Sequence, residues 1–189
     1  MNLSSDKKYK FENMNIIAET QRILVREFDK NELHLLLSID ADERLTQYVK
    51  KRSVEESKRV FKDSLKDYKS GSGLGRWGMF NIADNDFIGL CMLKPSDYDA
   101  SNIELGYRLH QKYWGLGIAT ELSKALITYG VEKLGLKEVC AVTHPANLAS
   151  QRVLEKAGMV RQGTVFWYEA ELPFFTSLTQ RFQKDSYGG

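Results

Sequence analysis

Hydrophobic and polar residues alternate along one short stretch of the chain, which is the pattern of a β-strand with one buried face, and several other stretches are apolar and strand-like. In the first stretch, residues 20–28, Ile23 and Val25 alternate with Arg22 and Arg26. The other stretches predict strands at residues 77–83, 87–94, 102–110, 138–143, 159–170 and about 174–182. Seven strands are therefore expected.

Apolar residues at helical spacing predict helices in the first half of the chain. Asp29 is expected to cap a short helix that runs to Leu37. Ser53 and Glu56 have the S-x-x-E spacing of a capping box, so a second helix should begin there and end at Gly71. The buried side of this second helix is expected to carry Val60, Phe61, Leu65 and Tyr68.

Two further helices are predicted in the second half, at residues 118–134 and from a cap at Asn147 to Gly158. Asp84, Asn85 and Asp86 are turn residues between two predicted strands, which indicates an antiparallel hairpin. The elements then follow the order ββ hairpin, βαβα, ββ. This order predicts a mixed sheet with helices on it. The sheet and helices form one α/β domain over residues 1–189, of which about the first 13 residues are expected to be a flexible tail.

Composition narrows the class of protein without indicating a chemistry. A chain of 189 residues with 42% hydrophobic and 28% charged residues is typical of a globular domain. The net charge of +2 favours neither a nucleic acid nor a membrane as partner. The first residues lack the apolar core of a secretory signal, so a cytoplasmic monomer or homodimer is expected. Cys91 and Cys140 stand in apolar stretches and should be buried free thiols.

Gly115 and Gly117 lie between a predicted strand and the start of a predicted helix. Glycine allows a ligand close to the backbone, and the amides of residues 116–120 would face a phosphate with the helix dipole behind them. A pyrophosphate suits such a turn, although a plain strand-to-helix turn also favours glycine. A Rossmann site would need a third glycine where Thr120 stands, and a Walker loop would need a Gly-Lys-Ser/Thr sequence that this segment lacks.

Three blocks of sequence resemble the GNAT family of acetyltransferases, and within it the RimJ and RimL kind of ribosomal-protein N-terminal acetyltransferase. The blocks are IELGY at residues 103–107, YWGLGIATE at 113–121 and NLASQRVLEKAGM at 147–159. The resemblance covers about residues 20–182. It implies a mixed, mostly antiparallel seven-stranded α/β sheet flanked by helices, with splayed fourth and fifth strands.

The resemblance also implies acetyl-CoA as co-substrate, with its pantetheine arm between the splayed strands and its pyrophosphate on the turn amides. The matching cofactor-binding residues are Leu105, Gly106, Tyr107, Lys112, Gly115, Leu116, Gly117, Ile118, Ala119, Thr120 and Asn147. Lys112 departs from the family pattern, which has arginine or glutamine there. A lysine at this position can still supply positive charge at the rim of the turn.

Acetyl transfer requires a neutral amine, a polarised thioester carbonyl and a proton for the departing thiolate. Glu104, on the strand beside the implied thioester, is the candidate base, acting directly or through water; the alternative is a surface carboxylate. Ser150 matches a serine of RimL-like enzymes and is the candidate acid; the alternative is a helix residue that bonds its own backbone. Many family members use a tyrosine as this acid, but Leu154 occupies that position.

These residues predict an acetyl-CoA-dependent N-acetyltransferase whose acceptor is a primary amine, either a protein N-terminus or a small amine. A CoA-binding sensor or interaction module without turnover is the alternative, and a nucleotide-binding oxidoreductase is a third interpretation. His34, His110 and His144 stand far apart without ligand spacing, so no metal is expected.

Overall fold

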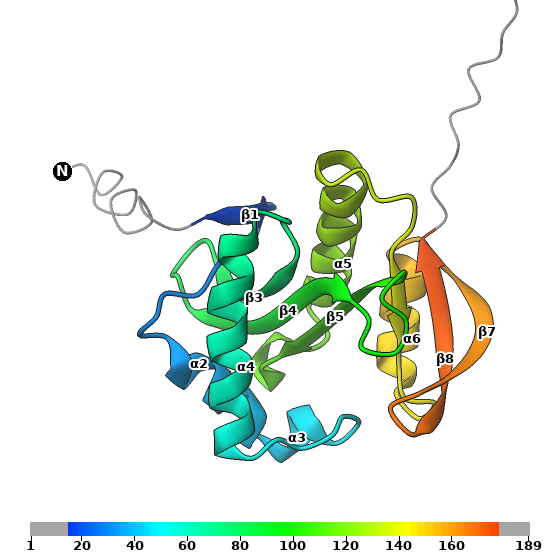
Figure 1. Ribbon diagram of the computed structural model, residues 1–189, viewed down its shortest axis with the longest axis horizontal. Coiled ribbons are helices and arrows are strands. Elements are labelled where there is room, and N and C mark those ends of the chain that lie inside the picture. Colours follow the sequence, from blue (N-terminus) through cyan, green and yellow to red (C-terminus); the bar gives the residue numbers. More distant parts are fainter. Residues whose placement is uncertain (1–14, 178–189) are drawn as a thin grey trace, which may run out of the picture.

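An eight-stranded sheet runs through the computed structural model, which describes residues 15–177 (Figure 1). Its strand order is β1-β2-β3-β4-β5-β6-β8-β7, and neighbouring strands are antiparallel except β5 and β6, which are parallel. The predicted mixed, mostly antiparallel sheet is confirmed. The strands are β1 (Ile16–Glu19), β2 (Ile23–Arg26), β3 (Gly75–Asn81), β4 (Phe87–Pro95), β5 (Ile103–Leu109), β6 (Cys140–Val142), β7 (Met159–Trp167) and β8 (Ala170–Ser177).

The eighth strand, β1, arises at the start of the chain, ahead of the strand predicted over residues 20–28, which is present as the shorter β2. The structure has two short strands there, β1 and β2, joined by a tight turn. The Thr20 hydroxyl shapes this turn, because it accepts hydrogen bonds from the backbone amides of Arg22 (3.3 Å) and Ile23 (2.9 Å). Such a hydroxyl offers the backbone an alternative to the strand ladder.

The helices of the first half are α2 (Leu33–Ala41), α3 (Glu43–Thr46) and α4 (Val54–Asp67), followed by the 3₁₀ turn η2 (Tyr68–Ser70). The predicted capping box of Ser53 and Glu56 is confirmed, with both reciprocal hydrogen bonds present. The helix predicted from Asp29 begins later, because the Asp29 carboxylate accepts from the amide of Asn31 in a local turn. The short helix α3 was not predicted.

The second half contains η3 (Gln111–Tyr113), α5 (Ile118–Thr128), the π-helical turn η4 (Tyr129–Lys133) and α6 (Leu148–Lys156). Asn147 caps α6 as predicted, because its side chain accepts from the Ser150 amide. The last hairpin turns earlier than predicted, with β7 ending at Trp167 and β8 beginning at Ala170. The predicted end of the last strand, residues 178–182, lies outside the described residues.

Two pairs of helices cover opposite faces of the sheet. Leu90 of β4 packs with Leu36, Ile39 and Phe61, so α2 and α4 cover the face seen in Figure 1. The next residue, Cys91, points the other way and packs with Leu122, Leu126 and Leu154 of α5 and α6. Burying a leucine completely contributes roughly 1.5–3 kcal/mol, so both cores hold the helices firmly to the sheet.

The sheet parts between β5 and β6. On one side, β5 pairs with β4 along its whole length, from Ile103 opposite Pro95 to Leu109 opposite Gly89. On the other side, it meets β6 at a single pair, Glu104 with Cys140. The edge of β5 that faces β6 is therefore open beyond Glu104 in the part of the chain that the structure describes, as the resemblance implied for the fourth and fifth strands.

Candidate functional site

The open edge of β5 contains the three strand residues predicted to bind a cofactor, Leu105, Gly106 and Tyr107. Their backbones pair with β4 on one side, while the side toward β6 carries no ladder partner within residues 15–177. An unpaired strand edge offers backbone N–H and C=O groups to any extended ligand. The edge therefore has the form that an extended amide-containing arm needs.

The glycine turn follows β5 and leads into α5. Gly115 and Gly117 have left-handed φ angles of 74° and 78°, a conformation that residues with a side chain rarely adopt. Gly117 is the N-cap of α5, and no side chain in the described residues caps this helix. The first amides of the helix, at Ile118, Ala119 and Thr120, are consequently available to an anion, which the helix dipole also favours.

Arg22, in the turn between β1 and β2, supports the glycine turn, and sequence analysis did not identify this contact. Its Nη1 donates to the carbonyl of Leu116 at 2.9 Å, and its Nε donates to the Glu121 carboxylate at 2.7 Å. Glu121 also accepts from the Thr20 hydroxyl at 2.6 Å. No local pattern predicts these bonds, because Arg22 and Glu121 are 99 residues apart in the chain.

Lys112 lies at the other side of the turn, but its ammonium group is paired. Its Nζ is 2.5 Å from the carboxylate of Asp86, which also accepts from the hydroxyl of Tyr113. These bonds lower the pKa of Asp86, so the carboxylate stays charged at neutral pH. A contact of Lys112 with a phosphate therefore stays a prediction that would require exchange of this ion pair.

Ser150 lies beside the open strand edge and meets Tyr107. The two hydroxyl oxygens are 3.0 Å apart, so either can donate to the other. Burial raises the pKa of Tyr107 to about 12, although the bond with Ser150 opposes the shift. Tyr107 is therefore protonated at neutral pH and has a proton to donate to Ser150. The Ser150 amide also bonds the Asn147 side chain at 3.1 Å, which joins the two predicted residues.

Glu104 occupies the point at which β5 and β6 part, because its backbone pairs with both Lys94 of β4 and Cys140 of β6. The residue is only 4% exposed, which excludes the alternative of a surface carboxylate. Burial raises the pKa of its carboxyl above the ordinary value, opposed by a hydrogen bond from Tyr168 and by the charge of Lys94. A carboxylate with a raised pKa is a better proton acceptor than an exposed one.

Tyr168 is a second residue that sequence analysis did not identify. Its hydroxyl donates to Glu104 Oε2 at 3.0 Å. It reaches Glu104 from the two-residue turn between β7 and β8, where Tyr168 and Glu169 have φ angles of 54° and 61°. Hairpin turns with two positive φ angles favour Asn-Gly, so a Tyr-Glu pair is strained and gives no turn signal in the sequence.

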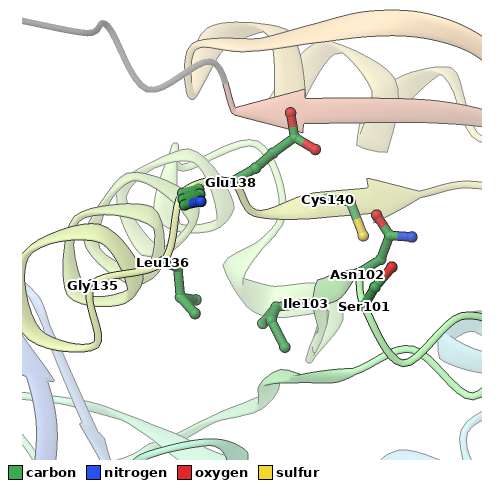
Figure 2. A pocket seen from close by; sticks show the side chains of 8 residues that line it. Ser101, Asn102, Ile103, Gly135, Leu136, Glu138 and Cys140 are labelled. Carbon is green, nitrogen blue, oxygen red and sulfur yellow. The ribbon is translucent and has the colours of Figure 1, made fainter.

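A cavity of about 290 Å³ lies at the beginning of β5 and β6 (Figure 2). Figure 2 shows the Cys140 side chain beside Asn102 and Ser101, with Ile103 and Leu136 lining the cavity below. None of the predicted catalytic or cofactor-binding residues lines it. The cavity therefore lies among residues that precede Glu104 in β5 and at the start of β6. The predicted site lies along the residues of β5 that follow Glu104.

The two cysteines lie in the protein core and not in the predicted site. Cys91 and Cys140 are buried free thiols, as predicted, and burial raises the pKa of Cys140 to about 12. Such a thiol is not a nucleophile at neutral pH. Within residues 15–177, no group of three or more His, Cys, Asp or Glu side chains is arranged to hold a metal ion. In the same part of the chain, every helix is too short or too polar to span a bilayer.

Comparison with known proteins shows the family of this chain. The family model of the acetyltransferase (GNAT) domain matches residues 22–160, which is most of the chain. Among curated proteins, the chain is similar to the uncharacterized N-acetyltransferase YoaA of Bacillus subtilis. The two are 25% identical over 167 residues, which cover 86% of this chain and 94% of the relative.

Solved structures share the fold. A putative ribosomal-protein-serine acetyltransferase from Vibrio cholerae superposes with a TM-score of 0.71 at 21% identity, covering 86% of this chain and 97% of that one. The ribosomal L7/L12 α-N-protein acetyltransferase RimL, solved in complex with coenzyme A, gives a TM-score of 0.71 at 17% identity over 87% of this chain and 98% of its own. These neighbours are of the kind that the three sequence blocks resemble.

Proposed function

Because the chain belongs to the GNAT family of acetyltransferases, we propose that it transfers the acetyl group of acetyl-CoA directly to a primary amine. The observation that carries this proposal is the position of Glu104, a buried carboxylate at the point where β5 leaves β6. Beyond that point the open strand edge and the glycine turn offer backbone groups to a long, phosphate-bearing ligand. A base and a binding edge are thus adjacent.

The open strand edge and the glycine turn support the assignment of acetyl-CoA as co-substrate. The backbone of Leu105, Gly106 and Tyr107 would pair with the pantetheine arm, and the uncapped amides at the start of α5 would bind the pyrophosphate. Asn147 and Lys112 complete the set of residues that we assign to the cofactor. When bound, acetyl-CoA supplies an acyl group on a thiolate leaving group.

Glu104 would take the proton that the amine must lose, directly or through water. The amine nitrogen then forms a bond to the acyl carbon, the carbon–sulfur bond breaks, and the thiolate receives a proton from Ser150. Tyr107 can restore the proton to Ser150, because the two hydroxyl oxygens are 3.0 Å apart. Glu104 then releases its proton to solvent and Tyr107 takes one from solvent, so that one proton passes in net from the amine to the thiol.

We assign an α-amino group as the preferred acceptor, which includes a protein N-terminus. An α-amine with a pKa near 8 costs about 1.4 kcal/mol to deprotonate at pH 7, whereas a lysine-like amine near 10.4 costs about 4.6 kcal/mol. Glu104, the candidate base at this site, is a carboxylate and therefore a weak base, so the lower cost suits this site. The structural neighbours named for ribosomal proteins support a polypeptide acceptor.

The test combines acetyl-CoA binding with release of free thiol in the presence of an N-terminal serine peptide. Wild type should bind acetyl-CoA and release thiol, while Glu104→Gln should bind equally and lose roughly 10²- to 10⁴-fold in kcat, the usual contribution of a general base. Glu55→Gln, an exposed carboxylate of α4, is the matched control and should behave as wild type.

Two outcomes would contradict the proposal. Absence of acetyl-CoA binding by the wild type would remove the family activity from this chain. The second outcome is that the wild type and Glu104→Gln bind acetyl-CoA equally and neither releases thiol with any amine. This result would favour a sensor or interaction module that binds CoA without turnover.

A further inference from the structure

Three arginines gather on the sheet face that α2 and α4 cover, next to Glu104. Arg76 of β3 is opposite Met92 of β4, which is opposite Gly106 of β5. Alternate residues of a strand share a face, so Arg76, Glu104 and Arg108 project from the same side of the sheet. Arg52, just before α4, approaches the same region, because it shares the carboxylate of Asp40 with Arg108.

Within residues 15–177, the buried carboxylate of Asp40 is the counter-ion of two of these three guanidinium groups. Asp40 is 4% exposed, and its Oδ1 lies 2.7 Å from Nη1 of Arg108 and 3.4 Å from Nη1 of Arg52. Its other oxygen accepts from the Ser57 hydroxyl at 2.6 Å. Both Asp40 oxygens are therefore in use, and neither contacts Arg76.

Arg76 is the arginine without a partner. Its guanidinium makes no hydrogen bond or ion pair with any group in residues 15–177, although the side chain is partly buried. Nearby, Lys94 is already paired with Asp97. Removing a cation from water without an opposite charge is costly, so an unpaired guanidinium beside a reactive carboxylate needs an explanation.

The electrostatic neighbours of Arg76 show where its guanidinium lies. Burial lowers its pKa, the charge of Arg52 lowers it further, and Asp97 and Tyr168 oppose these effects. Arg76 in turn lowers the pKa of Glu104, whose carboxylate bonds Tyr168. The guanidinium is therefore close enough to Arg52, Arg108 and Glu104 to interact with each of them electrostatically.

We propose that the acceptor carries a carboxylate close to its reactive amine and that Arg76 binds this carboxylate while Glu104 accepts the proton. The inference rests on the proposed function and names the substrate class. Arg76 and Glu104 stand two strands and two residues apart, about 12 Å between Cα atoms by strand geometry. Two long side chains across that separation leave room for a short acceptor with both groups.

Such an acceptor is either a free amino acid or a polypeptide with an acidic residue next to its N-terminus. Four probes separate these sources: a tetrapeptide amide with aspartate at its second position, its asparagine counterpart, free serine and serinamide. Each pair differs in one carboxylate. A charge-assisted hydrogen bond at a partly buried site predicts a kcat/KM that is roughly 10- to 100-fold higher for the acidic member.

The Arg76→Gln variant should lose this preference through a higher KM for the acidic acceptor, so that the acidic and neutral members of each pair are acetylated with similar kcat/KM. Arg59→Gln removes the same charge from an exposed position of α4 and should keep the preference. A preference confined to the peptides assigns a polypeptide acceptor, and one confined to serine assigns a small molecule. Equal kcat/KM values in both pairs, or a preference that survives in Arg76→Gln, would overturn the proposal.

The melting temperature of Arg76→Gln distinguishes a role of Arg76 in binding from a role in stabilising the fold. Removing an unpaired charge should leave the melting temperature of Arg76→Gln unchanged or higher, so a clear decrease would overturn the inference. If no amine is acetylated, the proposed function fails separately. Calorimetry with the N-acetylated aspartate and asparagine peptides then tests the site by itself. Tighter binding of the acidic peptide by the wild type, with no such difference in Arg76→Gln, would support the site. Equal binding of the two peptides by the wild type would refute it.

Discussion

At the scale of single residues, Glu104 combines a buried position with a raised pKa. A carboxyl whose pKa is higher in the folded than in the unfolded protein binds protons more tightly when folded. Its contribution to stability is therefore greatest at low pH and declines as the pH rises from the unfolded pKa, about 4.3, through the folded pKa. At neutral pH the charged Glu104 weakens the fold, which is consistent with a role in chemistry.

The pH dependence of the reaction should report this carboxyl. Catalysis needs both a deprotonated Glu104 and a neutral amine, so log kcat/KM should rise with a slope of about 2 below the pKa of Glu104 and about 1 between that pKa and the amine pKa near 8. The break should lie above the ordinary glutamate value. Glu104→Gln should show a slope of about 1 throughout, and a wild type with the same single slope would contradict the assignment.

The hydroxyl pair of Ser150 and Tyr107 allows a test of coupling. We expect Ser150→Ala to lower kcat up to roughly 100-fold, the low end for general acids, because a thiolate is a good leaving group. Tyr107→Phe should lower kcat less. If the two act as one relay, the double variant should lose little more than Ser150→Ala alone. Multiplicative losses in steady-state kinetics would show that the hydroxyls act independently.

At the scale of elements, the glycine turn has a backbone conformation that favours glycine, and it also carries the amides that we assign to the pyrophosphate. A side chain at Gly117 would meet little, since the nearest atom to its Cβ would be Nη2 of Arg22 at 3.6 Å. The φ of 78° and not the available space is what requires glycine. The same turn is tied to the turn between β1 and β2 through Arg22, so its shape depends on residues 94 positions earlier in the chain.

Substitutions at Gly117 should separate these two effects. Gly117→Ala should cost roughly 1–2 kcal/mol of stability from the left-handed conformation and weaken acetyl-CoA binding, while Gly117→Glu should abolish binding through repulsion of the pyrophosphate. Gly71, with a φ of 72° and nothing near its Cβ, is the matched control. Gly71→Ala should cost similar stability in chemical unfolding and leave calorimetric binding intact; unaltered binding in Gly117→Glu would show that the turn is only architecture.

At the scale of the whole molecule, the proposed cofactor would join parts that belong to different layers. The open edge lies in the sheet, the anion-binding amides in α5 and the hydroxyl donor in α6. These groups come together in the folded protein alone, so a ligand that contacts all of them binds the folded state selectively. Binding must then stabilise the fold.

Thermal unfolding should measure this effect. A hundredfold excess of acetyl-CoA over its Kd adds about 2.7 kcal/mol, which for a domain of this size raises the melting temperature by roughly 5–11 °C. NAD should give no comparable shift, because the turn lacks the third glycine of a dinucleotide site. An equal shift with NAD would favour the oxidoreductase interpretation.

Some features could be predicted because their signals are local. The Ser53 capping box and the Asn147 cap each act within three residues, and the glycines of the turn are required by their own backbone angles. The strands β3, β4 and β5 were predicted because each is an apolar stretch of seven to nine residues, and turn residues separate β3 from β4. Short elements such as α3 and β1 gave too few positions for a pattern.

The sequence by itself therefore determined the helices with caps, the longer strands, the glycine turn and, through resemblance, the positions of Glu104 and Ser150. The tertiary structure decided which groups meet. Tyr168 reaches Glu104 across 64 residues, and Tyr107 reaches Ser150 across 43. The fold also leaves Arg76 without an ion-pair partner among residues 15–177, while Asp40 pairs with Arg52 and Arg108. Contacts of this kind depend on strand register and on helix placement, and no spacing along the chain encodes them.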